Sequence, residues 1–328
     1  MVNMGIIGTN WITDSFIKSA SMVEGFKLNA VYSRTEERAK LFAGKYNVQH
    51  IYTDIKEMAR SKVIDAVYIA SPNSCHAEQA IEFLNNGKHV LCEKPITSNI
   101  RELRALVEAA RQNNVLLMEA MKSTFLPNFK VIEDNLHRLG KIRRFFANYC
   151  QYSSRYDLVK DGAKINIFSP EFSGGSAMDI GIYCIYPIIK LFGMPKEIKA
   201  SALKLASGVD GLGSLILSYD EMEGVIIHSK ITQTYIPSEI QGEDGSMVID
   251  RIDGPRKVQI YFRDGRIEDI SVPQKEDQMY YEAKEFISLI DAGKTESSVN
   301  TWEISCNVMK VLDEARAQNG IVFKADSV

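Results

Sequence analysis

The first 120 or so residues alternate short apolar runs with longer amphipathic stretches, and this rhythm constrains the fold more than any other feature. The stretch 98–114 repeats apolar residues at helical spacing and begins at Ser98, which we expect to be its N-cap, with Glu102 close behind. Apolar runs that alternate with helices are typical of βαβ units and a parallel sheet. The strands are expected at residues 4–8, 28–33, 65–70, 88–92 and 115–119.

The rhythm changes after about residue 122. Helices are expected at 125–140, ending at Gly140, and at 175–193, and two more close the chain near 276–292 and 301–318. Strands with little helix between them are expected at 143–153, 197–206, 213–219, 224–231, 246–251, 257–262 and 268–272. We therefore predict an α/β protein with two domains. Residues 1–121 form a doubly wound parallel sheet of the Rossmann type, and residues 122–328 form an α+β domain with an open, mostly antiparallel sheet.

Composition excludes several classes of function. A length of 328 residues favours two domains, and a net charge of −3 argues against a nucleic-acid-binding surface. No apolar run approaches the roughly 20 residues of a membrane span, and the N-terminus does not resemble a signal peptide. The five cysteines form no CxxC pair and the five histidines lack metal-ligand spacing. We expect a cytoplasmic, reduced protein without a metal and without nucleic-acid or membrane partners.

The stretch GIIGTNWITDSF (5–16) places a strand, a turn and a helix start in succession. Such a turn offers backbone N–H groups and the positive end of a helix dipole to a pyrophosphate. Gly8 keeps the first glycine of the dinucleotide fingerprint, Asn10 stands for the second because Asn tolerates positive φ, and a threonine stands for the third. We expect Gly8, Thr9, Asn10, Trp11 and Ile12 to contact a dinucleotide. An ordinary strand–turn–helix is the alternative.

Ser33 and Arg34 follow the second strand, where an NAD-preferring fold places an acidic residue for the ribose 2′-OH. A hydroxyl and a guanidinium suit a 2′-phosphate, so we favour NADP over NAD. Glu36 and Glu37 lie close by, which keeps NAD open, and a solvated helix start would explain the same residues.

The stretch YIASPNSCHAEQA (68–80) runs from a buried strand into a loop and a helix that starts near residue 74. Ligands of open α/β sheets bind at this carboxyl end of parallel strands, so Ser71, Pro72, Asn73 and His76 are candidate cofactor contacts. A plain strand-to-helix loop, with a packed histidine, is the alternative.

LCEKPI (91–96) lies at the carboxyl end of a further strand. Glu93 and Lys94 stand where a buried strand should end, and a lysine at the rim of an apolar core costs free energy unless it is compensated. Several loops that converge on one edge favour a functional role for Lys94. A solvated charge pair is the alternative.

GGSAMDIGIYCIYP (174–187) places Asp179 and Tyr183 four residues apart, on one face of a helix. The surrounding residues are apolar, so the aspartate needs a cationic or hydrogen-bonding partner, and Lys94 is the candidate. The alternative is a core helix whose tyrosine hydroxyl binds the backbone.

These motifs resemble the Gfo/Idh/MocA oxidoreductases, through GIIGTNWI, VYSR, YIASPNSCH, CEKP, the DIGIY helix and IQGEDGSMVID (240–250). Tyr183 stands where histidine is commoner, which resembles a tyrosine-type branch of the family. In MEAMKSTFLPNF (118–129), Lys122 and Thr124 replace a Trp and an Arg of that branch near its substrate side, so the substrate stays open. The resemblance implies an N-terminal Rossmann domain and a C-terminal domain with an open sheet.

The resemblance implies hydride transfer between NADP, or NAD, and a carbinol carbon of a sugar, polyol or cyclic diol. Tyr183 is expected to be the general acid/base; a phenol has a pKa near ~10, and a neighbouring ammonium such as Lys94 lowers it. Lys94 would also touch the nicotinamide ribose, Asp179 would orient Lys94 and bind a substrate hydroxyl, and Glu93 would face the ribose or hold the loop.

A non-catalytic dinucleotide sensor or regulatory protein on the same fold is the alternative function. Apolar alternation at 213–219 and 224–231 suggests that one face of the second sheet is covered by another subunit. The resemblance implies a homodimer through that sheet, with tetramers also known in the family.

Overall fold

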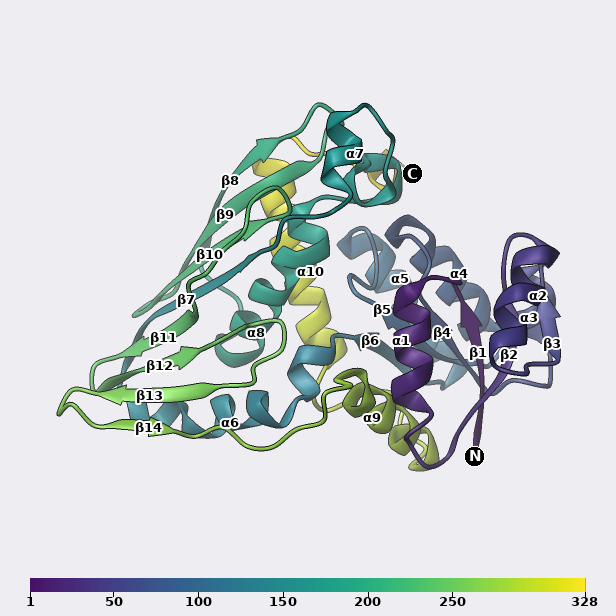
Figure 1. The fold of residues 1–328 in the computed structure, drawn as a ribbon, viewed down its shortest axis with the longest axis horizontal. Helices are drawn as coiled ribbons and strands as arrows, with labels where there is room; N and C mark the ends of the chain where they lie inside the picture. The colour runs from purple at the N-terminus through teal and green to yellow at the C-terminus, as the bar shows by residue number, and fades with distance from the viewer. Residues whose placement is uncertain (328) are drawn as a thin grey trace. The chain divides into compact units, whose positions relative to one another are not determined.

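A computed structural model describes residues 1–327, and the chain in it divides into two compact units. The first unit comprises Met1–Lys122 and Lys275–Trp302, and the second comprises Ser123–Gln274 and the segment from Glu303 onward (Figure 1). From the sequence we expect a single boundary after residue 121, whereas in the structure the chain returns to the first unit at Lys275.

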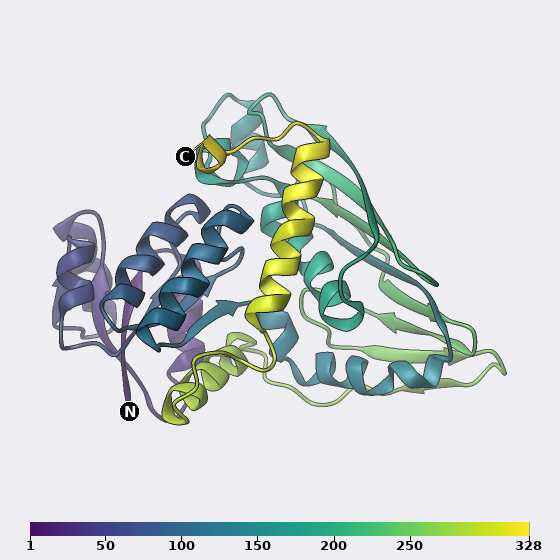
Figure 2. The same ribbon diagram turned by 180° about the vertical axis from the view of Figure 1, so that it is seen from behind.

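The first unit contains a six-stranded parallel sheet in the order β3-β2-β1-β4-β5-β6, which is the doubly wound arrangement. Helices cover both of its faces: α1 packs against α9 on one side and α4 against α5 on the other (Figures 1 and 2). The strands are β1 (Val2–Ile7), β2 (Phe26–Tyr32), β3 (His50–Tyr52), β4 (Ala66–Ile69), β5 (His89–Glu93) and β6 (Leu117–Ala120), and the helices are α1 (Trp11–Ala20), α2 (Glu36–Lys45), α3 (Ile55–Arg60), α4 (Asn73–Asn85), α5 (Ile100–Asn113) and α9 (Met279–Asp291).

The central strands form because their residues are apolar on both faces, as a sheet between two helical layers requires. All four residues of β4 are buried. The three-residue strand β3 was not predicted, because a run that short carries no periodic signal. The N-cap of α5 is Asn99, one residue beyond the predicted Ser98; its side chain accepts a hydrogen bond from the Glu102 N–H at 3.0 Å.

The segment 275–302 belongs to the first unit because it seals the edge beside β6. The Leu117 N–H donates to the Thr295 carbonyl at 3.3 Å, and the Trp302 indole donates to the Leu117 carbonyl at 2.9 Å. Ile287 on α9 lies against Gly25, where an added Cβ would come within 3.2 Å of it. These contacts bury the outer face of α1 and the last strand.

The second unit contains an eight-stranded sheet in the order β14-β13-β12-β11-β7-β10-β9-β8. All neighbouring pairs are antiparallel except β7 with β10. Helix α8 packs on β7 and β10. The strands are β7 (Ile142–Cys150), β8 (Glu197–Lys204), β9 (Asp210–Ser218), β10 (Glu223–Ser229), β11 (Ser238–Gly242), β12 (Gly245–Ile249), β13 (Val258–Phe262) and β14 (Ile267–Asp269), and the helices are α6 (Pro127–Asn135), α7 (Tyr156–Lys160), α8 (Ile182–Phe192) and α10 (Trp302–Gln318).

The predicted helix 175–193 is not uniform. A π-helical turn, Ala177–Gly181, precedes α8. The stretch Pro170–Phe192 is long and apolar enough to cross a membrane by length and composition, contrary to our expectation from the sequence. However, 78% of its apolar window is buried inside the structure, so we interpret it as a core helix.

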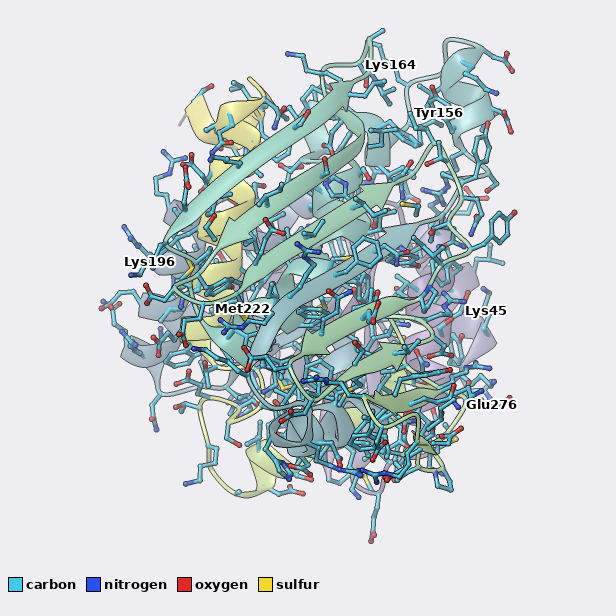
Figure 3. All side chains as sticks on the ribbon, turned by 90° about the vertical axis from the view of Figure 1, so that its left-hand side faces the viewer. Lys45, Tyr156, Lys164, Lys196, Met222 and Glu276 are labelled. Atoms are coloured by element: carbon cyan, nitrogen blue, oxygen red, sulfur yellow. The ribbon has the colours of Figure 1, made fainter. Side chains whose placement is uncertain are left out.

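One face of the second sheet is not covered by helices (Figure 3). The strand register aligns three apolar residues on it, because Val225 on β10 pairs with Ile216 on β9 and with Phe146 on β7. Ile216 is 40% exposed and Leu203 on β8 is 50% exposed. This face is apolar enough to need explanation.

Candidate active site

The first turn of the first unit packs closely against the end of β4. Gly8 has φ +102, and a Cβ there would lie 2.5 Å from the Ala70 carbonyl oxygen, so only glycine fits. The loop therefore runs directly beside the end of β4, and α1 begins at Trp11. Thr9, Asn10 and Trp11 lie on this loop at the surface.

Asn10 has a different role from the one we predicted. Its φ is −119, not positive, and its Oδ1 caps α1 by accepting from the N–H groups of Ile12 at 3.0 Å and Thr13 at 3.3 Å. Its Nδ2 donates to the Ala70 carbonyl at 3.0 Å. Asparagine is suited to this position because it can cap the helix and tie two loops together at once. Thr13 is fully buried in place of the third glycine.

Ser33 and Arg34 lie directly beyond β2. Ser33 is buried and its N–H donates to the Tyr52 carbonyl at 3.1 Å, whereas Arg34 is exposed. Burial raises the pKa of Tyr32 and the Arg34 guanidinium opposes this. The same guanidinium opposes the raising by burial of the pKa of Cys75, in the first turn of α4. Arg34 thus supplies an exposed positive charge at the edge where α4 also begins.

His76 connects two of the predicted loops. Its ring is buried, with Nε2 2.9 Å from the Ser71 carbonyl oxygen and Nδ1 3.0 Å from the Pro95 carbonyl oxygen. Burial, and to a lesser degree the Lys94 charge, lower its pKa. These two contacts hold the loop that follows β4 to the loop that follows β5. Pro72 occupies the N-cap position of α4 without a side-chain capping bond, and Asn73 is the first residue of that helix.

Lys94 is half-buried, between two buried neighbours, Glu93 and Pro95, and the Lys94–Pro95 peptide bond is cis. The Glu93 carboxyl accepts a hydrogen bond from the Tyr68 hydroxyl at 2.5 Å. Of the two roles considered for Glu93, this contact supports holding the loop. Glu119 on β6 is not among the residues predicted from the sequence; its carboxyl accepts from the Ile96 N–H at 3.0 Å and fixes the far side of the same loop.

Lys122 follows β6, and its ammonium donates to the Gln278 side-chain oxygen at 3.1 Å, just before α9. Burial raises the pKa of both Glu93 and Glu282, and the positive charge of Lys122 partly opposes this. The lysine that departs from the family pattern is therefore in electrostatic contact with acidic residues of the first unit.

In the second unit, Asp179 lies on the π-helical turn and forms an ion pair with Lys230, just beyond β10. π-Helical turns occur frequently at functional sites. Lys230 is almost completely buried, and its ammonium also lies 5.8 Å from the centre of the Phe168 ring. From the sequence we expect Lys94 as the partner of Asp179; Lys230 was not predicted, because no spacing links positions 51 residues apart.

Tyr183 is on the first turn of α8 and is 8% exposed. Its ring contacts the Tyr149 ring edge-on, with centroids 5.7 Å apart. Burial raises the pKa of Tyr149, and the carboxylates of Asp253 and Asp179 add to this. The Tyr149 hydroxyl donates to the Gln151 side chain at 3.0 Å. Asp179 and Tyr183 thus lie within a cluster of polar side chains on one helix and its neighbouring strand.

Buried polar side chains on β9 and β10 contact the start of the π-helical turn. The Ala177 N–H donates to Asp210 at 2.6 Å, and the Ser176 hydroxyl lies 2.9 Å from Nδ1 of His228. A Cβ on Gly175, where φ is +120, would lie 2.2 Å from the Asp210 carboxyl. Only glycine therefore fits at position 175. Among residues 1–327, no cluster of three or more His, Cys, Asp or Glu side chains could hold a metal.

A doubly wound sheet with a glycine-dependent turn, an N-terminal helix end and a basic residue beyond β2 defines a dinucleotide-binding protein of the Rossmann class. A family model described as "Oxidoreductase family, NAD-binding Rossmann fold" matches residues 2–121, and one described as "GFO/IDH/MocA C-terminal domain" matches residues 135–248. The chain belongs to the Gfo/Idh/MocA family of oxidoreductases and is an NAD(P)-dependent enzyme.

Relatives match the whole chain. It is 56% identical over 326 residues to scyllo-inositol 2-dehydrogenase (NADP(+)) IolU of Bacillus subtilis (strain 168), with 99% of both chains covered. It is 29% identical to trans-1,2-dihydrobenzene-1,2-diol dehydrogenase of Xenopus laevis, with 97% of this chain and 98% of the relative covered. A 3-ketoreductase from Actinomadura kijaniata, solved with NADP and TDP-benzene, has the same fold: TM-score 0.86, 22% identity, and 98% and 99% of the two chains covered.

Proposed function

We propose that the protein is an NADP-dependent dehydrogenase of a cyclic polyol of the inositol class. The observation that carries this proposal is the 56% identity, across both units, to an enzyme whose name specifies scyllo-inositol and NADP(+). The more distant relatives named for a cyclic dihydrodiol favour the same chemical class, a ring that bears neighbouring hydroxyl groups. Sugars and open-chain polyols are the other substrates to be compared.

The residues beyond β1 and β2 fit NADP. Gly8 lets the loop run close beside the end of β4, so that the loop leads directly into the start of α1, and Asn10 already uses the N–H groups of Ile12 and Thr13. The phosphate would therefore be held by the N–H groups of the loop before them, at Thr9 to Trp11. Arg34 and Ser33 would bind the 2′-phosphate through a charge-assisted contact and a hydroxyl. The loops at Ser71–Asn73 and Glu93–Lys94 would line the remainder of the cofactor, and His76 would hold these two loops together.

The reaction removes a hydride from a ring carbon and a proton from its hydroxyl, which leaves a ketone. When bound, NADP⁺ supplies the hydride acceptor at C4 of its nicotinamide. In this proposal Tyr183 accepts the hydroxyl proton, Lys94 polarises the reacting oxygen and binds the nicotinamide ribose, and Asp179 binds a substrate hydroxyl. A positive charge favours the phenolate and so lowers the barrier to proton transfer. Lys230 would keep Asp179 ionised as a hydrogen-bond acceptor.

The experiment is a turnover assay, which follows the reduced nicotinamide across inositol isomers, aldoses and open-chain polyols with NADP⁺ and with NAD⁺. We expect an inositol to give the highest kcat/KM, with NADP⁺. Lys94→Ala and Tyr183→Phe should each lower kcat by about 100-fold or more, since each removes a group that acts on the reacting oxygen. Tyr186→Phe, one turn further along α8, is the matched control and should leave kcat within about threefold.

Two outcomes contradict the proposal. If turnover survives both Lys94→Ala and Tyr183→Phe, the catalytic roles assigned to these two residues are wrong. Tight NADP⁺ binding without turnover of any compound in the panel would favour a dinucleotide sensor.

We also propose that the protein acts in the cytoplasm and as a homodimer through the uncovered face of the second sheet. Free thiols at all five cysteines suit a reducing compartment. The apolar row that Ile216, Val225 and Phe146 form is typical of a surface that a second copy covers.

A further inference from the structure

Glu282 is a buried acid that the proposed reaction does not use. It lies on α9 and is fully buried, and neither carboxyl oxygen has a hydrogen-bond partner among residues 1–327. An ionised carboxylate without donors in a dry interior is very costly, whereas a neutral carboxyl costs far less. The neutral form is therefore the one that this environment tolerates.

The charged and titratable groups that act on Glu282 come from three neighbouring strands of the sheet. Burial raises the pKa of Glu282 well above its usual range, the Glu93 carboxylate raises it further, and Lys122 partly opposes both. Tyr68 on β4 belongs to the same group, because the charge of Glu282 contributes to the raised pKa of that phenol. Glu93 ends β5, and Lys122 follows β6.

Of the two carboxyl groups, Glu93 has the neighbours that stabilise a negative charge. It accepts the Tyr68 hydroxyl at 2.5 Å, and the charges of Lys94 and Lys122 both favour its ionised form against the effect of burial on its pKa. Two carboxyls that share a buried environment cannot both ionise cheaply, so one keeps a proton. The hydrogen bond and the neighbouring lysines assign the charge to Glu93 and the proton to Glu282.

We propose that Glu282 is a positioning residue for Lys94: it stays protonated, so that Glu93 alone carries the negative charge that holds the Lys94 loop. For the role of Lys94 this inference rests on the proposed function. The proton on Glu282 does not enter the reaction. It keeps the second carboxyl from competing for Lys122 and from repelling the Glu93 charge.

Unfolding tests the protonation. The unfolded chain releases the Glu282 proton near pH 4.5, whereas the folded protein keeps it, so each rise in pH favours unfolding. Glu282→Gln has no proton to lose. Above about pH 5 the unfolding equilibrium constant of wild type should therefore grow relative to that of Glu282→Gln by about tenfold per pH unit, until the folded protein releases the proton. Urea titrations across pH measure this ratio. Glu285→Gln, on the same helix, is the matched control for the amide substitution, because that carboxyl accepts from the Ser297 hydroxyl; an equally steep change in its ratio would show that the effect is not specific to Glu282.

Cofactor affinity tests the positioning. The chain has two tryptophans, exposed Trp11 on the cofactor loop and buried Trp302, so tryptophan fluorescence can follow NADP⁺ binding. Glu282→Gln should bind NADP⁺ within about twofold of wild type, because the amide is polar and neutral. Once the pH is high enough for the folded protein to release the Glu282 proton, wild type should bind NADP⁺ more weakly than Glu282→Gln, because two buried carboxylates then repel each other and compete for Lys122.

Three results would overturn the inference or separate it from the proposed function. If the ratio of the unfolding equilibrium constants of wild type and Glu282→Gln does not change with pH, Glu282 is not the carboxyl that keeps the proton. Affinities for NADP⁺ that stay equal in wild type and Glu282→Gln at every pH show that the acid only fills space. If wild type itself binds no NADP⁺, the proposed function and the positioning role both fail, while the pH dependence of unfolding still decides where the proton lies.

Discussion

At the scale of single residues, Arg34 is the side chain on which the choice of cofactor depends in the proposal. Arg34→Ala should raise the KM for NADP⁺ by about 10- to 100-fold, the cost of one charge-assisted contact, and should leave the KM for NAD⁺ within about twofold. Arg38→Ala, exposed one turn further along α2, is the control. Equal losses for both cofactors would show that Arg34 stacks on the adenine and does not read the 2′-phosphate.

Asp210 and His228 offer a second residue-scale prediction. Burial raises the pKa of Asp210 to about 6 and lowers the pKa of His228 to about 4. Between these values the folded pair holds its proton on Asp210, whereas the unfolded pair holds one on His228, whose ordinary pKa is 6.5. Both states bind one proton, so the pair adds almost no pH dependence to stability.

Asp210→Asn should make the stability of the protein depend on pH through His228 alone. The folded histidine stays neutral where the unfolded one is charged, so stability is present above pH 6.5 and is lost as pH falls toward 4. The expected slope is about 1.4 kcal/mol per pH unit, measured by urea titration. An unchanged slope in the variant would mean that the two groups do not exchange their proton on folding.

Sequence reasoning succeeded at residues whose environment is set by their neighbours in the chain. Gly8 stands between a strand and a helix start, so its place in the turn was predicted, whereas the positive φ expected at Asn10 was wrong. Lys230, Glu119 and Glu282 could not be found in this way, because a buried charge has a role only through partners that the tertiary fold supplies. The assignments of Lys94, Tyr183 and Asp179 to catalysis remain predictions.

At the scale of elements, the start of α1 is the most informative. Asn10→Ala removes a double cap and the tie to Ala70, and should lower the free energy of unfolding by about 1–2 kcal/mol. It should also weaken NADP⁺ binding several-fold, because the cofactor loop loses its anchor. Asp54→Ala removes the comparable cap of α3 and should lower stability similarly without a change in affinity. Equal affinity losses in the two variants would contradict a local role for Asn10.

Long elements with a clear period were predicted within a few residues, and short or irregular ones were not. Helix α5 and strand β4 were anticipated because their apolar pattern is continuous. Strand β11 (Ser238–Gly242) and the π-helical turn Ala177–Gly181 were missed. The turn depends on Asp210, which lies on β9 and accepts a hydrogen bond from the Ala177 N–H. Local sequence therefore cannot specify the turn.

At the scale of the whole molecule, the uncovered sheet face predicts association. Val225→Glu places a charge in the centre of the apolar row and should convert a dimer to monomers, because a buried unpaired charge is costly. Sedimentation velocity measures the change. Lys27→Glu, an exposed charge change in the first unit, should leave the mass unaltered. A wild type that sediments as a monomer would contradict the proposal.

The return of the chain to the first unit at Lys275 has a consequence for limited proteolysis. Three covalent links join the units, after Lys122, Gln274 and Trp302. Cleavage at any one of them leaves two links intact, so a nicked molecule stays one particle. A fragment that ends at Lys122 lacks α9 and the Trp302 anchor to Leu117, and it exposes the apolar surface that they cover. The nucleotide-binding half can be isolated only as two pieces of chain held together without a bond between them.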